Sequence, residues 1–492
     1  MPEHTLDPIF HPRAIALVGV SSSEDTGSRG GGGGGFLASL LEQGFEQRHG
    51  LYPVNPKMTT VRGLPCYPTL LDTPDPVDHV ISLIPARAVP TLVDQAIQKK
   101  VRSIHFYTAG FSETGDPAMA AMEADVIGKL RAAGIRAFGP NCMGLYVPSE
   151  QVAFMNGFPG EPGNVMVISQ SGANAGDIVH GLGRRGVRFS KVISFGNGID
   201  VRAHHLFDYA VADPQTEVIT AYVEGVQDGR LMFEAVKAAA RVKPVILLKG
   251  GLTSAGARAA HSHTGSLAGS VEIFDALCRQ TGAMRAETMD DLHDLVVAVT
   301  TSVKRIKGRG VGLIAGGGGF AVLSSDAIAT AGLDVPPTPE ETKRLLREYI
   351  PTAGTSVNNP IDANSATPEL AQKTLRLVSE ASTNDVVIAA PSLGQRGLPD
   401  AHDTAAPPER DEQVRDQIRA GVEMYARTQE ETGTPIVALL RERSATVEQM
   451  DLFYQEAYRA GVGTYPTVAR AARAIALVLR WRERRQGLPA LF

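Results

Sequence analysis

The sequence AIALVGVSSSEDTGSRGGGGGGF occupies residues 14–36 and decides the fold class. Its first seven residues, Ala14–Val20, form an apolar run bounded by turn residues, which is typical of a short buried strand. The stretch Phe36–Gln43, which follows the glycines, has a helix-like composition. A strand, a glycine-rich turn and a helix in this order are typical of the beginning of a nucleotide-binding α/β unit.

The same alternation continues along the chain after a turn-rich stretch at Tyr52–Lys57 (YPVNPK). Strands that alternate with helices indicate parallel, doubly wound sheets. Further strands are predicted at Val77–Ile84, Ser103–Tyr107, Gly134–Phe138, Asn164–Ser169, Lys191–Phe195, Val218–Val223, Pro244–Leu248, Val311–Ala315, Val386–Ala390 and Ile436–Leu440. Helices are predicted at Pro90–Lys99, Ala118–Ala133, Arg230–Ala240, Ser270–Thr281, Met289–Val303, Phe320–Ala331, Glu409–Glu430 and Ser444–Ala460.

The chain has 492 residues, which is too long for a single core. We expect three α/β domains, at residues 1–150, 160–303 and 310–485, with the basic, glycine-containing stretch Lys304–Gly310 as a linker. The second and third domains resemble a weak internal repeat, because each begins with a strand, a glycine-containing turn and a helix. Each also carries an Asn-x-Ile-Asp tetrad, at Asn197–Asp200 and Asn359–Asp362. The alternative is that any two α/β units share these features.

The composition excludes several classes of protein. A net charge of −5 without a basic run or an aromatic platform argues against a nucleic-acid partner. The three cysteines lie far apart with no metal-ligand spacing, so we expect small buried residues and no metal site. The sequence shows no signal peptide and no apolar run long enough to span a membrane. A cytoplasmic enzyme without membrane contact is the expectation.

The stretch Ala255–Ser270 (AGARAAHSHTGSLAGS) is the strongest indication of chemistry. Its residues are nearly all small, it contains His261 and His263, and it follows the predicted buried strand within Val242–Lys249. Open α/β sheets bind their ligands where strands end, so a histidine here could accept and pass on a phosphoryl group. The alternative is an ordinary surface loop.

Other polar groups also follow predicted strands. Glu224 ends the strand Val218–Val223, where a carboxylate could orient an imidazole by accepting a hydrogen bond from it; it could also simply lie beside a helix N-cap. Ser169, Gln170, Ser171 and Gly172 open a helix, whose N-terminus can bind an anion. The run Gly30–Gly35 could bring backbone N–H groups to a phosphate or could be a floppy loop. Lys57 could pair with a phosphate or be solvated.

Six motifs in the same order resemble those of the NDP-forming acyl-CoA synthetases, which are relatives of succinyl-CoA synthetase. The motifs are SHTGSLAG at 262–269, VEGV(x)DG at 223–229, SQSGA at 169–173, GPNCMG at 139–144, GFSE at 110–113 and YPVNPK at 52–57. The resemblance implies a Rossmann-like CoA-binding domain followed by two flavodoxin-like domains. It covers almost the whole chain.

The resemblance also implies roles for individual residues. His263 would be the phosphorylated histidine, Glu224 its stabilising partner, and Ser169–Gly172 the phosphate-binding helix start. Coenzyme A would be bordered by the glycine-rich turn with Gly19, Ser21, Gly30 and Gly31, and by Lys57, Pro140 and Asn141. The reaction would join a small carboxylic acid to CoA at the expense of ATP, through an acyl phosphate and a phosphohistidine, and would be reversible.

Two features depart from the family pattern. After the third domain only Trp481–Phe492 remains, so the chain resembles an α-type subunit. ATP or ADP with Mg²⁺ would then bind to an ATP-grasp β-type subunit on another polypeptide, and a hetero-oligomer is expected. Six consecutive glycines also stand where the family usually has a mixed loop. Two alternatives are a CoA- or acyl-CoA-binding protein without ligase activity, and a Rossmann-type oxidoreductase, which the absence of a suitably spaced acidic residue disfavours.

Overall fold

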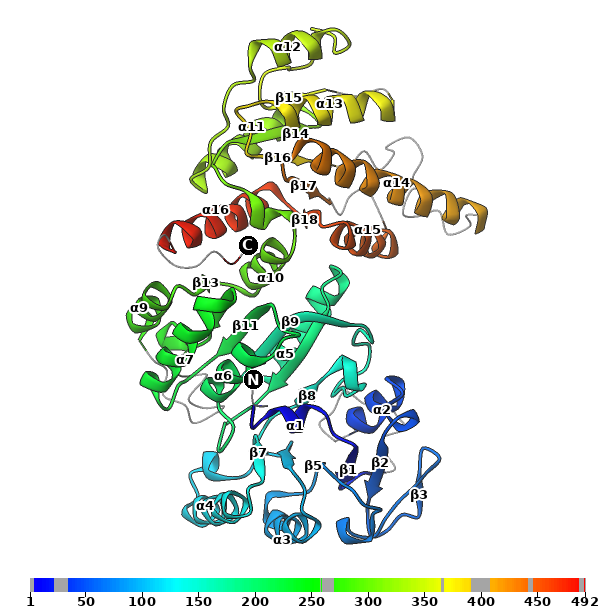
Figure 1. The fold of residues 1–492 in the computed structure, drawn as a ribbon, viewed down its shortest axis with the longest axis vertical. Helices are drawn as coiled ribbons and strands as arrows, with labels where there is room; N and C mark the ends of the chain where they lie inside the picture. The colour runs from blue at the N-terminus through cyan, green and yellow to red at the C-terminus, as the bar shows by residue number, and fades with distance from the viewer. Residues whose placement is uncertain are drawn as a thin grey trace. The chain divides into compact units, whose positions relative to one another are not determined.

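The computed structural model describes residues 4–21, 34–256, 258, 270–363, 367–390, 408–440, 446–485 and 491. The chain divides into two compact units: unit 1 comprises residues 1–180 and 188–287, and unit 2 comprises residues 181–187 and 288–492. Both units are built on parallel sheets with helices (Figure 1), which confirms the predicted α/β class. None of the described helices is long and apolar enough to cross a membrane.

The first sheet of unit 1 has the strand order β2-β1-β5-β6-β7, and all neighbouring strands are parallel. Because β1 lies between β2 and β5, the loops that leave β1 and β5 diverge and leave a crevice at their carboxyl ends. The strands are β1 (Ala14–Val18), β2 (Gly50–Val54), β5 (His79–Ser82), β6 (Ser103–Phe106) and β7 (Arg136–Phe138); β3 (Thr60–Val61) and β4 (Leu64–Pro65) form a small separate hairpin. The helices are α1 (Asp7–Phe10), α2 (Gly34–Glu42), α3 (Val89–Lys99) and α4 (Pro117–Ala132).

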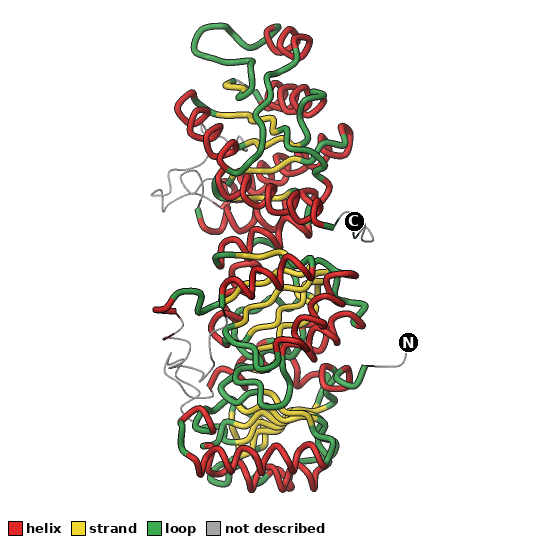
Figure 2. The backbone as a smooth tube through the Cα atoms, turned by 90° about the vertical axis from the view of Figure 1, so that its left-hand side faces the viewer, coloured by secondary structure: helices red, strands yellow, loops and turns green. Residues whose placement is uncertain are grey.

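One face of this sheet is covered by α3 and α4. Buried α3 residues recur at Val89, Leu92, Val93 and Ala96, the spacing of one helix face. They share a core cluster with α4 and with strands of the sheet. The lower part of Figure 2 shows helices running along one side of these strands. Burial of this apolar stripe fixes the sheet and therefore the position of its carboxyl edge.

The sequence analysis was wrong in part about Tyr52–Lys57. Gly50–Val54 forms strand β2, and the turn is confined to the residues that follow. Pro53 is compatible with a strand because β2 is the edge strand of the sheet. The Asn55 side chain then donates a hydrogen bond to the carbonyl of Val20, at 2.5 Å. This bond joins the turns that follow β1 and β2.

The second sheet of unit 1 has the order β13-β12-β11-β9-β10-β8. All pairs are parallel except β10 with β8, which are antiparallel. β8 belongs to this second sheet even though it precedes residue 150 in the chain. The strands are β8 (Gly144–Tyr146), β9 (Pro162–Ser169), β10 (Phe189–Ser194), β11 (Val218–Val223), β12 (Val245–Lys249) and β13 (Met284–Ala286). The helices are α5 (Gly172–Arg184), α6 (Ala203–Ala212), α7 (Gly229–Val242) and α9 (Val271–Thr281).

The third sheet lies in unit 2 and has the order β15-β14-β16-β17-β18, all parallel. This order equals β10-β9-β11-β12-β13 of the second sheet and therefore supports the predicted internal repeat. The strands are β14 (Val311–Ala315), β15 (Ile361–Asp362), β16 (Val386–Ala389), β17 (Ile436–Leu439) and β18 (Gly463–Tyr465). The helices are α10 (Met289–Thr300), α11 (Gly318–Thr330), α12 (Glu340–Arg347), α13 (Pro368–Glu380), α14 (Pro408–Thr432), α15 (Val447–Arg459) and α16 (Val468–Arg484).

The two Asn-x-Ile-Asp tetrads lie at equivalent strands of the two sheets but make different contacts. Asp200 follows β10 and accepts a hydrogen bond from Arg136 at 2.8 Å. Asp362 ends β15 and accepts one from the backbone N–H of Gly317 at 3.0 Å. The two aspartates therefore have different hydrogen-bond partners in the two sheets.

Candidate functional site

Three neighbouring strands of the second sheet bring their carboxyl ends together. In the sheet register, Tyr222 of β11 lies beside Ser169 of β9, and Val223 lies beside Lys249 of β12. The residues that follow these strand ends are therefore neighbours in space. Glu224 and the Ser169–Gly172 turn, both predicted from the sequence, meet here.

Gln170 connects this turn to Glu224. Its side chain is 5% exposed, and its Oε1 accepts hydrogen bonds from the backbone N–H groups of Glu224 at 2.7 Å and of Gly225 at 3.1 Å. Its own N–H donates to the carbonyl of Tyr222 at 3.0 Å. Through Oε1, Gln170 thus fixes the backbone that carries the Glu224 carboxylate.

The Glu224 carboxylate also has a side-chain donor. The Tyr222 hydroxyl lies 3.2 Å from Glu224 Oε1. Burial, together with the neighbouring Glu224 carboxylate, raises the pKa of Tyr222 to about 12. Tyr222 therefore keeps its proton at neutral pH and donates a hydrogen bond to the Glu224 carboxylate, which holds the carboxylate at the strand end.

The beginning of α5 is held by serine hydroxyls. Ser169 Oγ donates to the carbonyl of Ser171 at 2.6 Å and accepts from the Ser171 N–H at 3.2 Å. Ser171 Oγ accepts from the N–H of Asn174 at 3.3 Å, as an N-cap residue does. These hydroxyls shape the turn, so an anion would meet the backbone N–H groups of the first helical turn, where the helix dipole favours negative charge.

Lys249 is a site residue that the sequence analysis did not identify. Its ammonium group donates to the carbonyls of Glu224 and Gly250, each at 2.8 Å, and the residue is 7% exposed. Burial lowers the pKa of Lys249, and the Glu224 carboxylate opposes this shift. Lys249 places a cation beside the candidate anion site. The signal was present in the sequence as a lysine that ends an otherwise apolar strand.

Three predicted site residues, His263, Gly30 and Gly31, lie outside the described residues. After β12 the described chain continues to Gly256, with Arg258 beyond it, and resumes at Ser270. Ser270 Oγ accepts a hydrogen bond from the N–H of Ile273 at 3.3 Å and so caps α9.

A second group of predicted residues lies at the carboxyl edge of the first sheet. Gly19 follows β1 with φ of +100°, and a Cβ at this position would lie 2.8 Å from Cγ2 of Ile84, which follows β5. Only glycine allows this close approach. Ser21 and Lys57 are exposed, and the backbone N–H of Lys57 is held by Asn55 Oδ1 at 2.8 Å.

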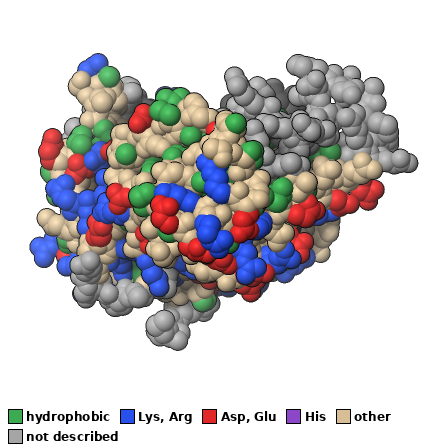
Figure 3. Space-filling view, turned by 90° about the horizontal axis from the view of Figure 1, so that it is seen from above, with side chains coloured by type: hydrophobic (Ala, Val, Ile, Leu, Met, Phe, Trp, Pro, Cys, Tyr) green, Lys and Arg blue, Asp and Glu red, His purple; other side chains and the backbone are tan. Residues whose placement is uncertain are grey.

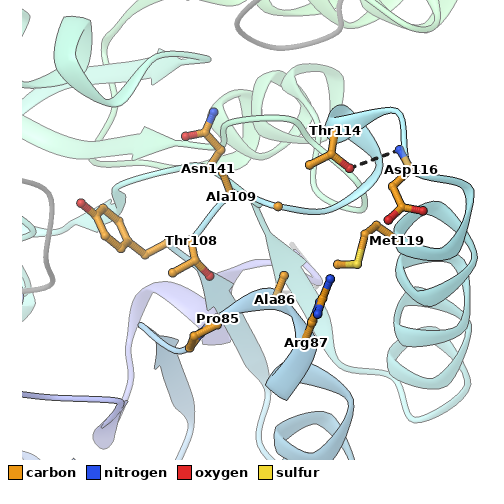
Figure 4. A pocket seen from close by; sticks show the side chains of 11 residues that line it. Pro85, Ala86, Arg87, Thr108, Ala109, Thr114, Asp116, Met119 and Asn141 are labelled. Atoms are coloured by element: carbon orange, nitrogen blue, oxygen red, sulfur yellow. Dashed lines mark hydrogen bonds between the residues drawn. The ribbon is translucent and has the colours of Figure 1, made fainter.

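Asn141 lines a pocket of about 660 Å³ at the same edge. Pro85, Ala86 and Arg87 enter it from the segment after β5, and Thr108 and Ala109 from the segment after β6 (Figure 4). The other lining residues are Tyr107, Gly110, Thr114, Asp116 and Met119. The pocket is open and mixed in character, and hydroxyl, amide, guanidinium and carboxylate groups border it.

The turn 139–144 lies between the two sheet edges of unit 1. The carbonyl of Pro140 accepts a hydrogen bond from the N–H of Asn197 at 3.1 Å, and the N–H of Met143 donates to Ser194 Oγ at 3.1 Å. A Cβ on Gly172 would collide with the Met143 side chain. The predicted CoA-side and phosphate-side residues are thus brought together through this turn.

Cys66, Cys142 and Cys278 are all buried and unpaired with one another, as predicted. Within the described part of the chain, no group of three or more His, Cys, Asp or Glu side chains is arranged to hold a metal ion.

A doubly wound sheet with a glycine after its first strand, followed by a second sheet with polar side chains and a helix N-terminus at its carboxyl edge, is typical of α/β proteins that bind nucleotides or related phosphate-containing cofactors. Family models agree with this class: a CoA binding domain matches residues 13–148, a succinyl-CoA ligase like flavodoxin domain residues 162–299, and a ligase-CoA domain residues 311–474. The chain belongs to the family of ADP-forming acyl-CoA synthetases.

Individual relatives agree with this assignment. The chain is 33% identical over 387 residues to the α subunit of an ADP-forming acetate–CoA ligase (II) of Pyrococcus furiosus, covering 78% of this chain and 82% of that one. It is also 33% identical over 388 residues to an ADP-forming acetate–CoA ligase (I) of Archaeoglobus fulgidus, covering 78% of this chain and 54% of that protein. The chain therefore spans about half the length of this second relative.

The fold is similar to that of a solved acetyl-coenzyme A synthetase, described as dinucleotide-forming, from Ca. Korarchaeum cryptofilum in complex with phosphate and ADP. The TM-score is 0.77 at 27% identity, with 98% of each chain covered.

Proposed function

We propose that the chain is the α-type part of an ADP-forming acyl-CoA synthetase, which converts a small carboxylic acid, CoA and ATP to acyl-CoA, ADP and phosphate, reversibly. One observation carries this proposal. At the end of β11, Gln170 holds the Glu224 backbone N–H and Tyr222 holds the Glu224 carboxylate. This residue lies beside the strand β12, whose continuation in the sequence contains His263. A carboxylate beside a histidine is the pair that nucleophilic imidazole chemistry requires.

In the direction of ATP synthesis, phosphate displaces CoA from acyl-CoA and gives an acyl phosphate. A ring nitrogen of His263 then attacks the phosphorus, the bond between phosphorus and the acyl oxygen breaks, and the carboxylate leaves. Glu224 accepts a hydrogen bond from the other ring nitrogen and stabilises the positive charge that develops on the ring. ADP finally takes the phosphoryl group from His263, which returns the neutral imidazole.

The anion would be held by the first turn of α5. Ser169, Gln170, Ser171 and Gly172 shape this turn, and its N–H groups face developing negative charge with the helix dipole behind them. The Lys249 ammonium, which bonds the carbonyl of Glu224 at 2.8 Å, adds positive charge nearby. Both contributions stabilise phosphate in a partly desolvated place.

Coenzyme A would bind at the carboxyl edge of the first sheet. Gly19 and Ser21, with Gly30 and Gly31 of the glycine run, would bring backbone N–H groups to its phosphates. Lys57 would add a positive charge, and the Pro140–Asn141 turn would border the thiol end because this turn reaches the second sheet.

The remaining parts of the proposal concern context. We propose domain limits at 1–150, 160–303 and 310–485, a cytoplasmic location, and assembly with an ATP-grasp β-type subunit that binds ATP or ADP with Mg²⁺. The existence of a separate α subunit among the relatives supports such a division of the enzyme.

Phosphorylation of the purified chain tests the proposal. The chain is incubated with a candidate ATP-grasp partner, Mg²⁺ and γ-labelled ATP, and label that is acid-labile and base-stable is measured on this chain. We expect label on the wild type, none on His263→Ala, and strongly slowed labelling of Glu224→Gln. His261→Ala, which changes the neighbouring histidine, serves as the matched control and should still be labelled.

Unlabelled wild-type chain, from a partner shown to bind it, would contradict the synthetase proposal. If such a chain still binds CoA, it is a CoA- or acyl-CoA-binding protein without ligase activity. Label that persists in His263→Ala would place the phosphoryl group on another residue.

A further inference from the structure

His105 is buried in β6, next to the edge strand of the first sheet, and contacts the turn 139–144. It is the third residue of β6, it is 0% exposed, and its Nε2 lies 2.7 Å from the carbonyl oxygen of Cys142. A carbonyl can only accept, so Nε2 carries the proton and donates it. Burial lowers the pKa of His105 to about 4, and the ring is therefore neutral at physiological pH.

The turn is fitted closely against this ring. A Cβ on Gly144 would lie 2.5 Å from Nδ1 of His105, and one on Gly139 would lie 2.5 Å from the carbonyl oxygen of Phe106, the next residue of β6. Both glycines have positive φ, +78° and +93°. The buried Nδ1 has no hydrogen-bond partner among the described residues, because the backbone of Gly144 covers it. Among the described residues, the ring's hydrogen-bond partner is the Cys142 carbonyl.

The other side of the ring contacts the helix that follows the glycine run. Phe36 of α2 meets His105 edge to face, with ring centroids 5.6 Å apart, and meets the pocket residue Tyr107 at 5.2 Å. His105 therefore contacts the 139–144 turn, which the proposed function assigns to CoA, and the helix α2, which follows the glycine run.

The other described polar contacts between the turn and the first sheet are longer. The Cys142 thiol lies 3.8 Å from the carbonyl oxygen of Phe106. The N–H of Asn141 donates to the carbonyl of Thr108 at a long 3.3 Å, and Asn141 has φ of +57°. Gly139 and Pro140 of the turn form backbone hydrogen bonds with Phe195, Asn197 and Ile199, which follow β10 of the second sheet. The His105 bond at 2.7 Å is thus the short polar contact that holds the turn to the sheet edge where the pocket lies.

We propose that His105 is a positioning residue for coenzyme A: its Nε2–H fixes the Cys142 carbonyl, and thereby sets the Pro140–Asn141 turn against the pocket that receives the cofactor. His105 does not touch CoA and takes no part in phosphoryl transfer. The identity of the ligand, CoA, rests on the proposed function. The hydrogen bond by which His105 holds the turn does not depend on that function.

CoA binding to the full-length chain, measured by calorimetry, tests the inference with three variants. His105→Leu removes the donor and leaves the Cys142 carbonyl buried without a partner, so affinity for CoA should fall about tenfold. His105→Gln places an amide N–H near the position of Nε2 and should restore most of this affinity. His79→Leu is the matched control: His79 is also buried and its ring stacks on His105, with centroids 6.3 Å apart, but it bonds Ser103 within the sheet at 2.7 Å and not the turn. This variant therefore changes the packing beside His105 without removing the Nε2–H donor.

Amide hydrogen exchange of the ligand-free chain separates this inference from the proposed function. His105→Leu should speed exchange at Asn141 and Met143, and His79→Leu should leave both unchanged at equal thermal stability. Unchanged exchange and unchanged CoA affinity in His105→Leu would overturn the inference, as would an equal loss of affinity in His79→Leu. A wild-type chain that binds no CoA, with faster exchange in His105→Leu, would instead refute the proposed ligand and keep the positioning of the turn.

Discussion

Gln170 Oε1 lies 2.7 Å from the backbone N–H of Glu224, so a side chain from the turn after β9 orients the residue that ends β11. The sequence indicated both residues but assigned Gln170 to phosphate binding. The structure gives its amide oxygen another partner, and this contact leaves the adjacent N–H groups of α5 to meet the anion. Gln170 and Glu224 therefore act as one assembly.

Replacing Gln170 by methionine keeps the volume but removes the acceptor. The partly buried N–H groups of Glu224 and Gly225 lose their partner, each at a cost of about 1 kcal/mol, and Glu224 shifts. We expect His263 phosphorylation to slow by about 100-fold, the effect of a displacement of about 1 Å in a catalytic group. Gln429→Met is the control: Gln429 is 6% exposed and accepts from the N–H of Ile436 in unit 2. If both variants slow labelling equally, the effect is general destabilisation.

Acid should destabilise unit 1 through buried neutral histidines. Burial lowers the pKa of His79 to about 3, with a contribution from His105; the ordinary value is 6.5. Between these values the unfolded chain binds the proton and the folded chain does not, so stability falls as pH decreases from 6.5. The slope is about 1.4 kcal/mol per pH unit for one such group. His79→Asn should flatten the pH dependence of urea unfolding by this amount between pH 4 and 6, and an unchanged slope would contradict the assignment.

The long elements of the fold were predictable from the sequence because their patterns are self-contained. The strand Val218–Val223 and the helices α3 and α4 were predicted to within one or two residues. The three-residue strands β8, β13 and β18 were missed. A strand of this length is too short to show an alternation of apolar and polar residues, and the strand forms because it pairs with a longer neighbouring strand.

The position of a candidate site residue was predictable where a polar side chain directly follows an apolar run, as Glu224 follows β11; its catalytic role is a proposal. Lys249 and Tyr222 were missed because their roles depend on tertiary contacts: the lysine bonds two carbonyls from different strand ends, and the tyrosine reaches the carboxylate two residues later. His105 likewise has a function only because the chain returns to cover it at Cys142. Contacts between distant residues are not visible in local sequence patterns.

Gly19 should not tolerate a side chain. Its φ of +100° and the 2.8 Å approach to Ile84 predict that Gly19→Ala destabilises the chain by about 1–3 kcal/mol and weakens CoA binding. Gly128→Ala is the control, since Gly128 lies exposed within α4 with no heavy atom within 4 Å of an added Cβ. That variant should gain about 0.5–1 kcal/mol. Thermal unfolding and CoA titration of both variants check the prediction, and equal behaviour would contradict it.

The buried ion pairs of unit 2 should matter far more than those on its surface. Asp294 is 4% exposed and accepts from Arg185 at 2.7 Å and from Arg470 at 2.6 Å. Asp294→Asn leaves these guanidinium groups without their counter-charge, so we expect a loss of about 3–5 kcal/mol. On the face in Figure 3, by contrast, acidic and basic side chains are intermingled in solvent.

The exposed pair Glu341–Arg344 of α12 provides the control for this prediction, with side chains 69% and 62% exposed. Solvent screens such a pair, so Glu341→Gln should leave stability unchanged. Urea unfolding at two salt concentrations measures both variants. The Asp294→Asn loss should persist at high salt because the buried pair is screened little. If the Asp294→Asn variant loses little stability, or if high salt abolishes the difference between it and the wild type, Asp294 is solvated in solution.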